Sequence, residues 1–239
     1  YADCVYEKAR ETLEEMIADG SFLMENKPCF YIYELTMNGR SQTGIVACSS
    51  IDDYVNGIIK KHENTREEKE IDRISHVDRT NAQTGPIFLV YRSVDAINQL
   101  VETEKKKTPV YDFTSPDGIT HRTWVISDDS VIKELEEAFA AIPSTYIADG
   151  HHRCASAVKV GLKRRKEHPG HTGDEEFNRF LSVLFPDDQL YIMPYNRVVK
   201  DLAGMTKEAF LEAVRNAGFM VSYLGKTPFA PEEKGTFGM

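Results

Sequence analysis

Apolar residues recur along the chain at two spacings, one typical of amphipathic helices and the other typical of strands. Helical spacing predicts a first helix at about 5–17 and later helices at 94–105, 128–141, 151–166 and 207–216. Apolar or alternating runs predict strands at 29–37, 44–49, 86–91, 109–113, 120–126, 144–148, 179–185, 189–199 and 219–224. The helix at 94–105 is expected to be exposed, and Trp124 is expected in the core.

Turn residues join several of these strands into hairpins. The first hairpin turns at Asn38-Gly39, the second at Ser115–Gly118 and the third at Pro186–Asp188. We therefore expect an α+β fold, with a mixed or antiparallel sheet built from hairpins and flanked by helices. The chain begins at Tyr1 rather than Met, so we interpret it as an internal fragment of a longer protein. Residues 1–239 are expected to form one domain, with lobes of about 1–143 and 144–239 as the alternative.

The segment 146–157 carries the strongest functional signal. An apolar strand ends at Asp149-Gly150 and a helix begins at once. A helix N-terminus presents unpaired N–H groups and attracts anions, and Gly150 lets a phosphate approach the backbone. His151, His152 and Arg153 add three donors to the first turn, where basic residues oppose the helix dipole. This conflict with local preference indicates an anion-binding site.

Two other interpretations of this segment stay open. One makes Asp149 simply an N-cap, with the two histidines on the surface. A metal ion is the other option, held by one histidine together with Asp149. Adjacent helical residues diverge by about 100°, so His151 and His152 are not expected to bind one ion together.

Residues 60–79 form a densely charged stretch that is expected to be a solvated helix with i,i+4 ion pairs. Near its start, Glu63 precedes a spaced set of cations. A carboxylate in such surroundings suits a general base, while the cations hold phosphate. The candidate phosphate-binding residues here are Lys61, His62, Arg66, Lys69 and Arg73. The polar segment 81–86, which contains Thr84, either lines the same cleft or is only a loop.

Charge and composition narrow the possible partners. The formal net charge is −9, which disfavours non-specific nucleic-acid binding. The 4 cysteines include no CxxC pair, and a chain this long has little need of disulfides, so we expect reduced thiols in the cytosol. No apolar run reaches the length of a membrane span, and no signal peptide opens the chain. A cytoplasmic location without membrane or nucleic-acid partners is therefore expected, and the oligomeric state is left open.

These motifs resemble the signature of domain-of-unknown-function family 1015 over nearly the whole chain. The matching segments are 39–44, 61–66, 69–70, 72–73, 81–86, 111–113 and 148–153. The segment Asp149–Arg153 is also similar to one in free serine kinases of the ParB/sulfiredoxin-like superfamily. That resemblance implies a ParB/sulfiredoxin-like core, phosphate binding by Gly150, His151, His152 and Arg153, and a catalytic base at Glu63.

The resemblance also implies a reaction. We expect nucleotide-dependent phosphoryl transfer to or from the hydroxyl of a small amino acid, serine or phosphoserine. ATP or ADP would be the nucleotide, and Mg²⁺ would be oriented by Asp149. One alternative is a phosphatase, in which His152 or a bound metal activates water without a nucleotide. The other is a nucleotide-binding regulatory module like the ParB switch domains.

Overall fold

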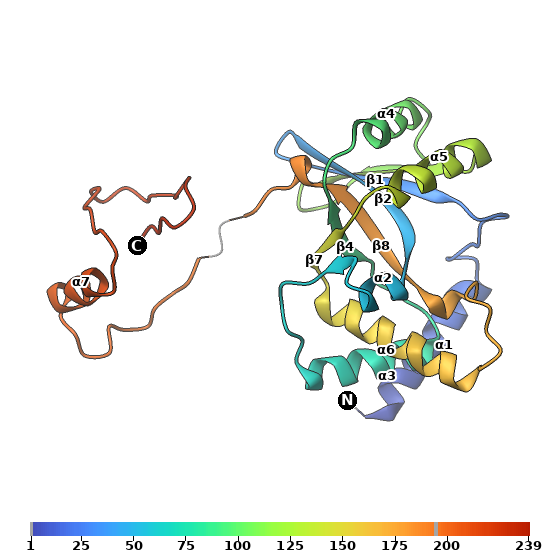
Figure 1. Cartoon of the computed structure of the whole chain (residues 1–239), viewed down its shortest axis with the longest axis horizontal. Helices are drawn as coiled ribbons and strands as arrows, with labels where there is room; N and C mark the ends of the chain where they lie inside the picture. The colour runs from blue at the N-terminus through green and yellow to red at the C-terminus, as the bar shows by residue number, and fades with distance from the viewer. Residues whose placement is uncertain (1, 194–195) are drawn as a thin grey trace. The chain divides into compact units, whose positions relative to one another are not determined.

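The computed structural model describes residues 2–193 and 196–239 (Figure 1). The chain forms two compact units, residues 1–190 and 191–239. The second unit contains one helix, α7 (Lys207–Asn216), within its described residues. The candidate site belongs to the first unit.

The first unit combines a sheet with helices from several parts of the chain. Its helices are α1 (Asp3–Ala18), α2 (Ile51–Val55), α3 (Glu67–Thr80), α4 (Asp95–Glu104), α5 (Asp129–Ala140) and α6 (His151–Glu167). Its strands are β1 (Phe30–Met37), β2 (Arg40–Ser50), β3 (Ile59–Lys60), β4 (Ile87–Tyr91), β5 (Tyr111–Thr114), β6 (Thr120–Ile126), β7 (Thr145–Asp149) and β8 (Arg179–Pro186). Short 3₁₀ turns, η1 (Glu176–Asn178) and η2 (Asp187–Gln189), flank β8.

All of these strands join one mixed sheet, in the order β3-β7-β4-β8-β2-β1-β6-β5. The pairs β3–β7 and β4–β8 are parallel, and the other neighbours are antiparallel. The expected α+β fold is therefore confirmed. So are the first two hairpins, β1–β2 and β5–β6. Asn38 and Gly39 take the positive φ angles of 52° and 77° that a tight hairpin turn needs.

The third predicted hairpin is wrong. The strand at 179–185 exists as β8, but its neighbours are β2 and β4. Both edges of β8 are thus occupied, so no strand from 189–199 can pair with it. The described residues of that stretch form no strand, and residues 194–195 lie outside the described part of the chain.

Two further predictions need correction. Residues 219–224 form no strand, and Met220 there is 98% exposed, without a neighbouring strand to bury it. The helix at 94–105 is not simply exposed, because Ile97 and Val101 of α4 are buried in the core. Trp124 is buried as expected, and its Nε1 donates to the Lys107 carbonyl at 3.0 Å.

The helices form two groups. Figure 1 shows α1, α3 and α6 gathered together, while α4 and α5 lie beside each other elsewhere on the sheet. Ion pairs fasten the first group: Asp78 of α3 accepts from Lys163 and Arg164 of α6, and Asp52 of α2 pairs with Arg165 of α6. These ion pairs hold the C-terminal part of α6, the helix that begins at the candidate site. None of the described helices is both long and apolar enough to cross a membrane.

A ladder of polar side chains crosses four strands on the other half of the sheet. Thr43, Glu34, Arg122 and Asp112 are direct cross-strand neighbours on β2, β1, β6 and β5. Glu34 is buried, accepts a hydrogen bond from the Thr43 hydroxyl at 2.9 Å and pairs with Lys105 at 2.7 Å. Burial alone would raise the pKa of Glu34, but Lys105, Thr43 and Arg122 together lower it. Residues 39–44 and 111–113, two of the segments that resemble the family signature, therefore contribute to the sheet.

At Gly44, strand β2 lies unusually close to side chains of β8. A Cβ atom placed there would lie 2.8 Å from the Phe185 ring and 2.9 Å from the Val183 side chain. We predict that Gly44→Ala lowers the free energy of unfolding by about 1–3 kcal/mol through overpacking. Urea unfolding measures the change. Gly170→Ala is the matched control, because no atom lies within 4 Å of its added Cβ. An equal stability loss in both variants would contradict the packing argument.

Candidate functional site

Two parallel strands at the edge of the sheet place the site. Ile59 and Lys60 of β3 pair in parallel with Thr145 and Tyr146 of β7. The carboxyl ends of parallel strands lie at the same end of a sheet, where ligands commonly bind in α/β structures. The segment 61–66 after β3 and the segment 149–153 after β7 therefore leave the sheet together.

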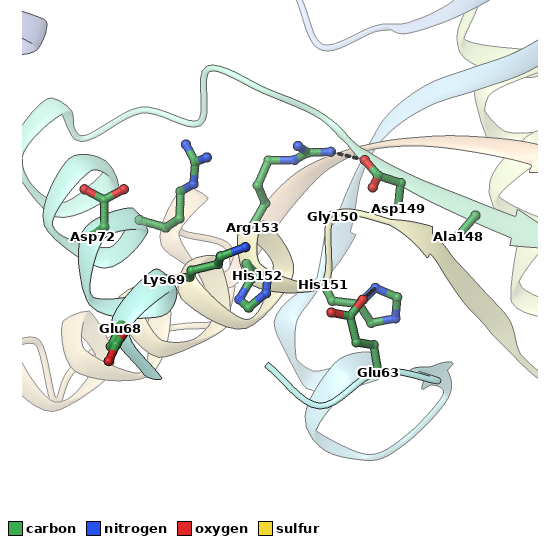
Figure 2. A pocket seen from close by; sticks show the side chains of 11 residues that line it. Glu63, Glu68, Lys69, Asp72, Ala148, Asp149, Gly150, His151, His152 and Arg153 are labelled. Atoms are coloured by element: carbon green, nitrogen blue, oxygen red, sulfur yellow. Dashed lines mark hydrogen bonds and ion pairs between the residues drawn. The ribbon is translucent and has the colours of Figure 1, made fainter. Parts of the chain in front are cut away.

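A pocket of about 540 Å³ lies where these segments meet α3 (Figure 2). Six of the residues predicted from the sequence line it directly, Glu63, Asp149, Gly150, His151, His152 and Arg153, and α3 adds two more, Lys69 and Arg73. The structure thus brings Glu63 into the same cleft as the β7–α6 junction, although about ninety residues separate them.

Gly150 shapes the start of α6. It is the N-cap residue, its φ angle is 93°, and no side chain caps the helix there. This positive φ angle favours glycine, and a Cβ atom at this position would also lie 2.9 Å from the Arg153 guanidinium, which would have to move aside. Asp149 is not the N-cap, which corrects that interpretation. Its carboxylate instead pairs with Arg153 at 2.8 Å (Figure 2). The first N–H groups of α6 are thus left without a side-chain cap.

Glu63 contacts His151 rather than His152. The Glu63 carboxylate lies 3.7 Å from His151 Nδ1, and the backbone N–H of His62 points at His151 Nε2 from 3.5 Å. The His62 ring packs edge-on against the His151 ring, with 4.5 Å between centroids. Nε2 then acts as acceptor, which places the proton of a neutral His151 on Nδ1, facing Glu63.

His151 is buried, only 5% exposed, and this keeps its imidazole neutral. Burial is the main cause that lowers its pKa, and His62 adds to it; Glu63 and Asp149 act in the opposite direction. His152 has a small further lowering effect. A neutral histidine can point its Nδ1–H at the Glu63 carboxylate, 3.7 Å away, without holding a charge in the interior.

Lys69 and Arg73 lie one turn apart on α3 and form a like-charged i,i+4 pair. Such a pair is unfavourable on a helix unless an opposite charge lies near. Among the described residues neither side chain makes an ion pair, whereas Lys159 and Lys163 of the facing α6 pair with Glu70 and Asp78. Lys69 extends from α3 toward the first turn of α6 (Figure 2). The two cations are therefore available to an anion in the pocket.

Two acidic residues that line the pocket, Glu68 and Asp72 of α3, were not among the predicted site residues, although Asp72 belongs to the segment 72–73, which resembles the family signature. The Tyr6 hydroxyl of α1 donates to Asp72 at 2.8 Å, and this hydrogen bond is the main cause that raises the pKa of Tyr6. For Glu68 the available signal was its position next to Lys69, and for Asp72 it was the motif that Asp72 shares with Arg73. The pocket therefore presents both signs of charge.

Four predicted residues do not line the pocket. Lys61 lies 5.7 Å above the Tyr54 ring, His62 touches the pocket only through His151, and Arg66 is the N-cap residue of α3. Thr84 is exposed. The solvated-helix interpretation fits α3 only in part, because its residue Glu70 is buried and the residues before Glu67 form a loop.

Two polar atoms at the start of α6 are buried without a hydrogen-bond partner. They are His152 Nδ1 and Arg153 Nε. Buried polar groups are usually satisfied, so these two atoms indicate that the structure has unused donor and acceptor capacity beside the pocket. The adjacent Cys154 is fully buried, and burial raises the pKa of its thiol to about 12, which suits an inert core residue.

A comparison with protein families shows to which family the chain belongs. The family model described as "Protein of unknown function (DUF1015)" matches residues 1–239. The chain belongs to the DUF1015 family. No curated protein and no solved structure matches it. The family resemblance in the motifs is thereby confirmed, and the activity of this DUF1015 protein has to be argued from its pocket.

A metal site built from protein side chains alone finds no support in the described part of this DUF1015 protein. No group of three or more histidine, cysteine, aspartate or glutamate side chains there has the arrangement of a metal site. Magnesium nevertheless needs only one or two protein carboxylates when a substrate supplies phosphate oxygens. Asp149, with a side chain that is 72% exposed at the pocket, meets this lesser requirement.

The buried state of His151 predicts a pH dependence of stability. Its pKa in the folded protein lies below the ordinary value of 6.5, so the unfolded chain takes up a proton first on acidification. The stability of the wild type should therefore fall as pH drops below about 6.5, and His151→Gln should remove this contribution. Urea unfolding at about pH 7.5 and about pH 5.5 measures it.

The exposed His168, outside this pocket, provides the control variant His168→Gln. The wild type should lose more stability between the two pH values than His151→Gln does, and as much as His168→Gln. An identical loss in all three proteins would show that His151 is not held neutral by its surroundings.

Proposed function

We propose that this DUF1015 protein transfers a phosphoryl group between a nucleotide and the hydroxyl of a small amino acid, serine or phosphoserine. One observation carries the proposal: Glu63 lines the same pocket as the uncapped start of α6 and the cations Lys69 and Arg73. A carboxylate base beside a phosphate-binding helix start is the minimum equipment for this reaction, because phosphoryl transfer depends mainly on positioning and charge.

Each part of the pocket then has a role. The serine hydroxyl gives its proton to the Glu63 carboxylate while its oxygen bonds to the terminal phosphorus of the nucleotide. The bond from that phosphorus to the bridging oxygen breaks, which releases ADP from ATP, or AMP from ADP. In the reverse direction Glu63 returns the proton. His151, neutral and facing Glu63, orients the carboxylate.

Charge in the transferred group is balanced by the protein. The N–H groups that follow Gly150 and the side chains of His152 and Arg153 face one side of the phosphoryl group. Lys69 and Arg73 approach from α3 on the other side. Magnesium bound with the nucleotide would add charge neutralisation, and Asp149 is the residue placed to hold it.

The choice of serine rests on the resemblance of Asp149–Arg153 to the free serine kinases. The pocket is compatible with it, because Glu68 and Asp72 offer negative charge for an ammonium group, while the cations suit phosphate and carboxylate. The acidic balance of the whole chain also suits a small-molecule substrate better than a nucleic acid.

A phosphorus NMR time course tests the reaction directly. The protein and Mg²⁺ are incubated with L-serine plus ATP or ADP, and separately with phosphoserine alone or with a nucleotide. The wild type should form phosphoserine only when a nucleotide is present, and Glu63→Gln should be slower by about 10²–10⁴-fold. Glu67→Gln is the control. It changes another glutamate of the charged stretch 60–79 that does not line the pocket, so it should keep the wild-type rate.

Other outcomes of the time course would replace the proposal. Phosphate released from phosphoserine without nucleotide would indicate the phosphatase, with His152 or a metal activating water. Nucleotide binding with no turnover in any mixture would indicate the ParB-like regulatory module.

Arg153 provides a separate test of nucleotide binding. Its guanidinium lies at the start of α6 and contacts Asp149, so Arg153→Ala should abolish nucleotide binding and leave the fold intact. Isothermal titration with ATP and ADP measures binding, and circular dichroism measures the fold. Arg92→Ala is the control, since Arg92 also pairs with an aspartate, Asp187, but lies away from the pocket. Unchanged affinity in Arg153→Ala would remove Arg153 from the binding site.

A further inference from the structure

A buried carboxylate follows directly after Lys69, which lines the pocket. Glu70 of α3 is only 5% exposed, although it belongs to the most highly charged stretch of the chain. It does not line the pocket, and the proposed reaction does not use it. Burying a charge is costly unless partners compensate for it. The contacts of Glu70 therefore show which interactions offset the cost of burying its carboxylate.

The carboxylate of Glu70 has two partners from different elements. One oxygen accepts a hydrogen bond from the Thr65 hydroxyl, in the loop between β3 and α3. The other oxygen pairs with the Lys159 ammonium group of α6. Burial alone would raise the pKa of Glu70, but the hydrogen bonds from Lys159 and Thr65 outweigh it and lower the pKa. Glu70 is thus held in its charged form.

The backbone of Glu70 makes a third connection. The hydroxyl of Ser156, which is fully buried in α6, lies 3.3 Å from the Glu70 carbonyl oxygen and 2.7 Å from the His152 carbonyl oxygen. Glu70 therefore ties together the three segments that form the pocket: the loop 61–66, the helix α3 and the first turns of α6. Thr65 is two residues beyond Glu63, so its bond restrains the loop close to that carboxylate.

The loop has few other restraints. Residues 61–64 and Arg66 are exposed, Thr65 is half-buried, and Glu63 has a side chain that is 57% exposed. Lys61 lies over the Tyr54 ring at the start of the loop, and His62 and Glu63 contact His151. The bond of Thr65 to Glu70 is the side-chain hydrogen bond seen for the second half of the loop in the described structure. Without it, the position of Glu63 would depend on its own 3.7 Å approach to His151 and on the contacts of the preceding His62 with the same histidine.

We infer that Glu70 is a positioning residue: through Thr65 it fixes the loop 61–66, and with it Glu63, against the first turns of α6. The inference deepens the proposed function and rests on it for the catalytic part. The restraint of the loop itself is a physical property that can be measured without any substrate.

The test compares variants of Thr65, because Glu70→Gln would leave Lys159 without a partner and could unfold the chain. Thr65→Val removes the hydroxyl and keeps the shape, whereas Thr65→Ser keeps the hydroxyl. Thr43→Val is the matched control, because it removes the same kind of bond, from a threonine hydroxyl of strand β2 to the buried carboxylate of Glu34, outside the loop 61–66. Glu70→Asp, whose shorter carboxylate keeps its charge, is the second variant.

Hydrogen exchange of the amides of residues 61–66 is the first readout. Thr65→Val and Glu70→Asp should each speed exchange in this loop by about tenfold or more, as expected for the loss of a hydrogen bond to a charged group. Thr65→Ser should exchange like the wild type, and Thr43→Val should leave this loop unchanged. Wild-type exchange in both Thr65→Val and Glu70→Asp would overturn the inference.

Phosphoryl transfer is the second readout. In Thr65→Val, kcat should fall while the KM for the nucleotide stays the same, because the start of α6 is intact, and Thr65→Ser should restore kcat. An equal fall in Thr65→Val and Thr43→Val would show a general loss of stability and overturn the positioning role. If the wild type shows no transfer at all, the proposed function fails, while the exchange measurement still decides whether Glu70 restrains the loop.

Discussion

The parallel pairing of β3 with β7 is the constraint on which the site depends. Only two residue pairs form it, Ile59 with Thr145 and Lys60 with Tyr146, at the edge of the sheet. Because both strands run the same way, the chain after each leaves the sheet at the same end. One exit becomes the loop with Glu63, and the other becomes the start of α6. A slip of this register by one residue would turn the exiting side chains to the opposite face.

The pocket concentrates charges that local preferences would separate. Basic residues begin α6, where the helix dipole is positive, and Lys69 repels Arg73 along α3. Away from the pocket, the basic residues near the end of α6 have partners of opposite charge, because they form ion pairs with Asp78 and Asp52. The pocket lining itself carries both signs of charge, with the carboxylates of Glu63, Glu68, Asp72 and Asp149 beside the cations Lys69, Arg73 and Arg153. The departure from local rules therefore lies in where the cations stand, at the start of α6 and one turn apart on α3, and the sequence reveals it.

Local signals explain which parts of the fold could be predicted. The hairpin β1–β2 is specified by Asn38-Gly39, and α5 by Asp128, whose carboxylate caps its first turn. The same signals cannot show which strands become neighbours. The apolar run 189–199 is therefore predicted to pair with β8, although β2 and β4 occupy both edges of that strand. The two-residue β3 is too short for any periodicity. The residues of the site were thus visible in the sequence, but their meeting was not, because it depends on the pairing of β3.

The two buried carboxylates at Glu34 and Glu70 show how similar chemistry serves different ends. Each is charged, each accepts from a threonine hydroxyl, and each pairs with a lysine. Around Glu34 the threonine belongs to a sheet strand that backbone hydrogen bonds already fix, so the network adds to a rigid ladder. Around Glu70 the threonine belongs to a loop that lacks such a ladder. The pair of Glu70 with Lys159 already holds α3 against α6, and the bond to Thr65 extends this fixed pair of helices to the loop that carries Glu63.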